Sequence, residues 1–230
     1  MKHMNNFKKE FSRYPATYSL AIITLGVWLS QFLANGVQAT EPMNLFHFGA
    51  LFGPDLIEHP THLWRLVTPI FVHIGWEHFL LNFFSLIFIG RQIEDVFGSR
   101  RFLAIYLLSG IFGNILAFFA QPYILLAGAS TSLFGIFGAM AMLGYLTKNP
   151  SFQAVGKQFA ILILANLVIN LFQPAVGIFG HIGGALGGVL LAAPFAPKIL
   201  QSKISEIQKA TFFIIYLVSA MLMIVLTIMG

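Results

Sequence analysis

The chain has 230 residues, of which 57% are hydrophobic and 9% are charged, with a formal net charge of +5 and a mean hydropathy of +0.81. About a quarter of the residues of a soluble domain are charged, so this composition excludes an ordinary soluble protein. The chain has no cysteine, which excludes disulfides, thiol catalysis and thiolate metal sites.

Seven apolar segments along the chain are candidates to cross a bilayer, which takes about 20 mostly apolar residues per helix. Backbone groups in lipid must be hydrogen-bonded within their own helix. We therefore predict an all-α fold, a polytopic membrane helical bundle. The expected spans are residues 16–35, 76–97, 102–120, 128–146, 158–172, 178–196 and 211–229. The first span has full length and no convincing cleavage site, so we expect no cleavable signal peptide.

These spans divide the chain into three expected parts. A cytoplasmic tail covers residues 1–15, a six-helix core covers 16–196, and a linker with a seventh span covers 197–230. The longest loop has about 40 residues, so we expect no separate soluble domain.

Basic residues predict the orientation of the bundle, because Lys and Arg gather in cytoplasmic loops. With the N-terminus in the cytoplasm and the C-terminus outside, only Arg65 of the 13 Lys and Arg residues lies on the outer side. This topology explains the positive charge without a nucleic-acid partner. The lack of cysteine and the short cytoplasmic tail suit a bacterial cell membrane.

A serine and a histidine are expected at the same depth in two inward-running spans. Ser130 lies 18 residues before Lys148, and His181 lies 17 residues before Lys198. At a rise of 1.5 Å per residue, both residues lie roughly 26 Å above the inner boundary of the hydrocarbon core of the bilayer, which is about 30 Å thick. The two side chains can therefore meet if their helices touch.

Small residues give these two helices a means of close contact. One face of the later span carries Gly180, Gly184 and Gly188, widened by Gly183 and Gly187. The earlier span offers Gly135 and Ala139.

The span over 76–97 adds two polar groups on one face, His78 and Asn82, which are four residues apart. If this helix ends at Gly98, Asn82 lies about 24 Å above that end. Polar groups inside membrane spans are costly and usually functional.

This set of residues suits acyl transfer. His181 can take the proton of Ser130 and make its hydroxyl a nucleophile. His78, Asn82 and the backbone N–H of Ser130 can supply the oxyanion hole that stabilises a tetrahedral intermediate. None of the eight carboxylates lies on the helices of Ser130 and His181, so we predict a Ser–His dyad.

Four motifs resemble those of the rhomboid family of intramembrane serine proteases. GASTSLFG, residues 128–135, resembles the nucleophile motif, and FGHIGGALGG, residues 179–188, resembles the motif around the catalytic histidine. HIGWEHFLLN, residues 73–82, matches the His and Asn pattern of the second helix. HLWR, residues 62–65, resembles the Trp–Arg motif of the first outer loop. The seventh span is similar to the six-plus-one class of this family.

The resemblance implies a serine endopeptidase that cuts transmembrane protein substrates and needs neither a metal nor a cofactor. It assigns Ser130 and His181 as catalytic, His78 and Asn82 as oxyanion donors, and Phe134 as the ring against the histidine. Gly128 opens the nucleophile motif, and His73 belongs to the second-helix pattern. The loop over 36–75 is expected to form a structured hairpin. Thr131 is a departure, because the family most often has Gly after the nucleophile.

Other readings of single residues stay open. Ser132 is a rival nucleophile, turned about 200° around the helix from Ser130. His73 orders the outer loop or an active-site water in our interpretation. Three polar residues of the fifth span either bond helices together, which we favour, or line the site beneath the loop QPAVG, residues 173–177; they are Asn166, Asn170 and Gln173.

Other classes of function fit the same residues less well than a protease does. The main alternative is a proteolytically silent rhomboid-like protein that binds client transmembrane helices. A metal site built from His73, His78 and His181 is a weaker alternative. A zinc protease would need His-Glu-x-x-His, which is absent. A transporter would need a midplane charged pair or an inverted repeat, and the sequence shows neither. The sequence does not indicate an oligomeric state.

Overall fold

The computed structural model describes residues 2–172, 177–201 and 204–230. Apart from an isolated β-bridge between Leu51 and Leu126, the regular structure of these residues is helical. Four helices are long and apolar enough to cross a membrane, and two shorter apolar helices accompany them. The predicted all-α membrane bundle is confirmed.

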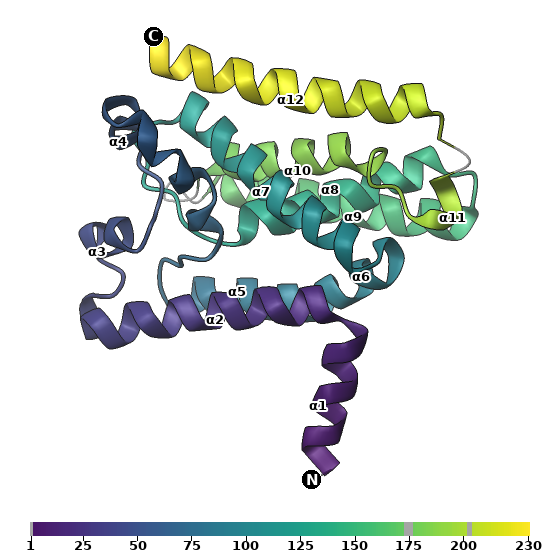
Figure 1. The fold of residues 1–230 in the computed structure, drawn as a ribbon, viewed down its shortest axis with the longest axis horizontal. Coiled ribbons are helices and arrows are strands. Elements are labelled where there is room, and N and C mark those ends of the chain that lie inside the picture. The colour runs from purple at the N-terminus through teal and green to yellow at the C-terminus, as the bar shows by residue number, and fades with distance from the viewer. Residues whose placement is uncertain (1, 173–176, 202–203) are drawn as a thin grey trace.

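The bundle is built from α2 (Pro15–Asn35), α7 (Ser99–Ala120), α8 (Ser130–Leu146), α9 (Pro150–Asn170), α10 (Ile178–Ala192) and α12 (Glu206–Met229). The second span consists of α5 (Trp76–Ser85), the π-helical turn η4 (Leu86–Gly90) and α6 (Arg91–Phe97). Short elements are α1 (Lys2–Arg13), η1 (Gly36–Gln38), α3 (Pro42–His47), α4 (Gly53–Glu58), η2 (Pro60–Leu66), η3 (Thr68–Ile70) and α11 (Lys198–Gln201). Figure 1 shows α12 along one side of the molecule, α2 and α5 along the opposite side, and α7 to α10 between them.

Each expected span corresponds to helical structure, but several boundaries were wrong because local capping signals override the apolar run. The fifth helix begins at Pro150 rather than 158, since the Asn149 side chain accepts a hydrogen bond from the Ser151 N–H. The seventh begins at Glu206 rather than 211, behind a capping box formed by Ser205. The sixth ends at 192 rather than 196, since Pro194 cannot continue it.

The second span packs against α2 along its whole length. The rings of Trp28 and Phe79 stack with centroids 5.0 Å apart. At the other end, the buried Glu94 carboxylate accepts hydrogen bonds from the Ala16 and Thr17 N–H groups at the start of α2, where the positive end of the helix dipole favours an anion. The helix ends at Gly98, as expected, with a φ of 77°.

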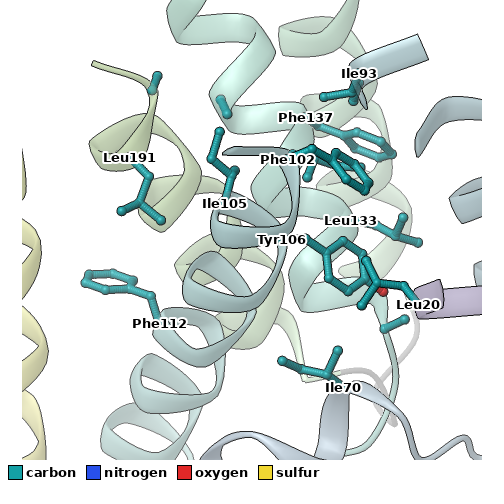
Figure 2. Packing of buried hydrophobic residues seen from close by; sticks show 14 of the residues in the cluster. Leu20, Ile70, Ile93, Phe102, Ile105, Tyr106, Phe112, Leu133, Phe137 and Leu191 are labelled. Carbon is teal, nitrogen blue, oxygen red and sulfur yellow. The ribbon is translucent and has the colours of Figure 1, made fainter. Parts of the chain in front are cut away.

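The core of the bundle is α10 held between α7 and α8. A Cβ at Gly188 would clash with the Gly135 carbonyl of α8, and a Cβ at Gly183 would lie 2.7 Å from Leu116 of α7. The glycines of α10 thus let two helices approach it at once. The apolar residues of α7 fill the remaining space, as Figure 2 shows for Phe102, Ile105, Tyr106 and Phe112 beside Leu133, Phe137 and Leu191.

The loop over 36–75 is structured, with α3, α4, η2 and η3 following one another. Arg65 is its centre: the guanidinium donates to the carbonyls of Phe46 and Ala50 and pairs with the Asp55 carboxylate at 3.1 Å. The loop is tied to the bundle by Asn114 of α7, whose amide donates to the Leu66 carbonyl.

The seventh helix lies against α7. The Tyr216 hydroxyl donates to the Leu108 carbonyl at 2.9 Å, and the Tyr216 ring lies 5.2 Å from that of Phe112. Apolar residues of α12 such as Phe213 and Met223 pack against the core. Most of α12 is exposed on the outside of the bundle, which is the surface that a membrane helix presents to lipid.

Candidate active site

Ser130 and His181 meet in the structure. Ser130 is the first residue of α8, and His181 lies in the first turn of α10. Nε2 of His181 lies 2.8 Å from Oγ of Ser130, and His181 is 8% exposed. The two helix N-termini are therefore level with one another, as the residue counts to Lys148 and Lys198 predicted.

Glycine contacts between α8 and α10 bring the two side chains within reach. A Cβ at Gly184 would clash with the Thr131 carbonyl, one residue beyond Ser130. The α10 backbone thus runs directly against the α8 backbone at the depth of the pair. A larger residue here would separate Ser130 from His181.

Phe134 fixes the plane of the histidine. Its ring lies parallel to that of His181, with an interplanar angle of 2° and centroids 4.3 Å apart. Because Phe134 lies one turn after Ser130 on α8, the same helix supplies both the hydroxyl and the ring that orients the imidazole.

His78 approaches the start of α8 through Gly128. That glycine has a φ of 134°, and a Cβ there would lie 2.8 Å from Nε2 of His78. Glycine is required for both reasons. Asn82 is 5% exposed and lies one turn further along α5, where its amide donates to the His78 carbonyl at 2.7 Å. This bond uses one of the two N–H groups of the amide.

His73 holds the peptide that precedes Ser130. It is fully buried, its Nδ1 lies 3.2 Å from the Phe71 carbonyl, and its Nε2 accepts from the Ala129 N–H at 3.4 Å. Both ring nitrogens are therefore engaged by backbone, which fits the reading of His73 as an ordering residue. Gln31 of α2 adds support, because its side chain bonds both the N–H and the carbonyl of His73.

Two buried hydroxyls follow Ser130 and point elsewhere. Ser132 is fully buried against α7, where a Cβ at Gly110 would clash with its Oγ. Thr131 faces α7 and α10, and its Cγ2 would lie 3.1 Å from a Cβ at Gly180. In the described residues, no position other than glycine has a positive φ, so Thr131 adopts its backbone without strain.

The polar residues of α9 have different hydrogen-bond partners in the structure. Asn166 donates to the Leu162 carbonyl of its own helix. Asn170, the last residue of α9, lies against His181, with its Nδ2 2.5 Å from Nδ1 of the imidazole. The contact of Asn170 with His181 bonds α9 to α10, as we expect for these polar residues, and it also places Asn170 in the site, whereas Asn166 bonds only its own helix. Gln173 and residues 174–176 of the QPAVG loop lie outside the described residues.

Among the described residues, a single cluster of three side chains has the spacing for a metal ion, and it includes neither Ser130 nor His181. It consists of Asp55, His59 and His62 in the loop over 36–75. Asp55 already pairs with Arg65 there, and Nδ1 of His62 lies 2.9 Å from its carboxylate. The Asp55 carboxylate at the centre of the cluster thus already has Arg65 and His62 as partners.

Comparison with known proteins gives the family. Residues 60–198 match the model of the rhomboid domain. The chain is 33% identical over 183 residues to "Rhomboid protease GluP" of Bacillus subtilis, covering 80% of this chain and 36% of that protein. It is 37% identical over 158 residues to "Rhomboid-like protease 3" of Toxoplasma gondii, covering 67% of this chain and 59% of that protein. The chain thus spans less than two thirds of the length of these curated relatives, and it belongs to the rhomboid family.

Proposed function

We propose that this protein is an intramembrane serine protease that hydrolyses peptide bonds in or near the transmembrane segments of membrane proteins. The observation that carries the proposal is the 2.8 Å contact between Nε2 of His181 and Oγ of Ser130. The relatives named as rhomboid proteases support it.

The reaction follows from the two partners. His181 takes the proton of Ser130 as Oγ attacks the scissile carbonyl carbon, and the carbonyl oxygen becomes an oxyanion. The N–H of Ser130, the ring of His78 and the free N–H of Asn82 are the donors for this oxyanion. When the tetrahedral intermediate collapses, His181 gives its proton to the leaving amine and an acyl-enzyme on Ser130 remains.

Water completes the cycle. His181 takes a proton from a water molecule, whose oxygen attacks the acyl carbon, and the proton returns to Oγ as the carboxylic acid product leaves. We propose that water and substrate come from the outer side of the membrane, with residues 1–15 as a cytoplasmic tail, 16–196 as the catalytic core and 197–230 as linker and seventh helix. A substrate helix hides its carbonyls in its own hydrogen bonds, so it must unwind at the cleavage point.

The test uses purified protein in liposomes with a model transmembrane substrate and a fluorophosphonate probe, which reacts with activated serines. Wild type and Ser132→Ala should cleave and be labelled, whereas Ser130→Ala should do neither. If folded wild type is neither labelled nor active, and Thr131→Gly does not restore these reactions, the protein binds client helices without cutting them.

A further inference from the structure

We propose that Asn170 is a positioning residue for the reaction, which accepts the Nδ1–H of His181 and makes the site a Ser–His–Asn arrangement. The inference rests on the proposed function. It starts from the contact between the Asn170 amide and Nδ1 of His181, which joins the last residue of α9 to the first turn of α10.

The tautomer of His181 determines which atom of the Asn170 amide must face Nδ1. A histidine that takes the serine proton on Nε2 carries its own hydrogen on Nδ1. That Nδ1–H then needs an acceptor, because an unpaired buried donor costs about 1–3 kcal/mol. The Asn170 amide can turn by 180° about its last bond and present Oδ1 in place of Nδ2. With Nδ2 facing Nδ1, the ring hydrogen would move to Nε2, and His181 could not act as a base.

Three neighbours then fix the imidazole. Phe134 holds its plane at an interplanar angle of 2°, Ser130 lies 2.8 Å from Nε2, and Asn170 holds Nδ1. The stacking partner prevents the ring from tilting but does not select a tautomer. Asn170 supplies that selection.

The packing of α9 explains how Asn170 reaches the site. At its inner end, α9 meets α8 at a glycine pair, where a Cβ at Gly144 would lie 2.7 Å from the Cα of Gly156. Gly156 is the buried residue of α9, whose other positions are at least partly exposed. At the end of α9 that holds Asn170, the helix is only partly buried, and Asn170 contacts His181 from there.

An amide suits this position better than a carboxylate would. No carboxylate of the described residues bonds to His181. A charged group in a membrane span is expensive, whereas a neutral amide offers the same acceptor geometry without that cost. The arrangement therefore orients the base without adding a charge beside it.

The test compares Asn170→Leu, which keeps the volume and removes the acceptor, with Asn170→Asp, which keeps an acceptor on a side chain of the same length. The matched control is Asn166→Leu, one turn earlier on α9, where the side chain bonds its own helix. We expect Asn170→Leu to lower kcat and the rate of fluorophosphonate labelling by about tenfold to a hundredfold, with KM unchanged. Asn170→Asp should retain more of both, and Asn166→Leu should match wild type.

Two results would overturn the proposal. One is an Asn170→Leu variant with wild-type kcat and labelling rate. The other is equal loss in the Leu and Asp variants, which would mean that Asn170 acts by packing. Absence of Ser130-dependent labelling in wild type would instead contradict the proposed function itself, so the two failures are distinguishable.

A measurement without catalysis protects the test against variants that do not fold. In ¹⁵N NMR spectra of histidine-labelled protein, with His181 assigned from a His181→Gln variant, wild type should show the Nδ1–H tautomer. Asn170→Leu should show a mixture of the two tautomers. A wild-type ring protonated on Nε2 would refute the assignment.

Discussion

Nε2 of His181 lies 2.8 Å from Oγ of Ser130, although 51 positions separate the two residues in the chain. The contact exists because α8 and α10 both begin at this depth and because glycines let their backbones touch. We propose that the two residues act as one functional unit, and the first prediction concerns that unit.

Ser130→Ala and His181→Ala should each lower kcat by at least about 10³-fold, and the double variant should be no worse than either single variant. The reason is that neither partner can start acyl transfer alone. The check is a double-mutant cycle on cleavage of a model transmembrane substrate in liposomes. Additive losses would mean that the two residues act independently.

Gly128→Ala should lower kcat with little change in KM. A methyl group there would clash with the ring of His78, and alanine resists the φ of 134°. Kinetics in liposomes measure the effect. Gly26→Ala is the matched control, because a Cβ at Gly26 meets nothing within 4 Å; unchanged kcat in Gly128→Ala would contradict the prediction.

Gly188→Ala should destabilise the bundle by about 1–3 kcal/mol, because the added methyl group forces α10 away from α8. That Cβ would lie 3.0 Å from the Ala139 nitrogen and closer still to the Gly135 carbonyl. The thermal unfolding midpoint in detergent reports the change. A midpoint equal to that of the Gly26→Ala control would show that the helices can separate without cost.

Arg65→Lys should destabilise the loop over 36–75 by about 2 kcal/mol or more, because lysine cannot bond two carbonyls and a carboxylate in one plane. In the structure, Arg65 contacts Phe46, Ala50 and Asp55 in this way. Limited proteolysis of the loop over 36–75 should therefore be faster in the variant. A proteolysis rate equal to wild type would show that the charge alone holds the loop.

Thr131→Val should keep or raise the unfolding midpoint. The Thr131 hydroxyl is buried without a hydrogen-bond partner, whereas its methyl group packs beside Gly180. Valine keeps that methyl group and removes the unpaired hydroxyl. A lower midpoint would mean that the hydroxyl has a partner in the membrane. The labelling rate of Ser130 should stay unchanged, since valine keeps the β-branched shape and the methyl group beside Gly180.

The sequence by itself determined the membrane class, the helical spans and the residues at the site's depth. All three follow from local properties of the chain. An apolar run of sufficient length indicates a membrane span, and the rise of 1.5 Å per residue along a helix gives the depth of each residue in the bilayer. Spacing and family motifs therefore predict Ser130, His181, His78 and Asn82 as site residues. The predicted first residues of α9 and α12 were wrong by several positions, because Asn149 and Ser205 cap these helices before their apolar runs begin.

Only the tertiary structure decided which neighbours these residues have. Asn170 and Asn166 look alike in the sequence, four positions apart on one face, yet one contacts His181 and the other bonds its own helix. Gln31 carries no motif, and its role in holding His73 depends on α2 lying beside α5. The physical reason is that depth depends on one helix alone, whereas a contact depends on the rotation and distance of two packed helices, which are set by side chains along their whole interface.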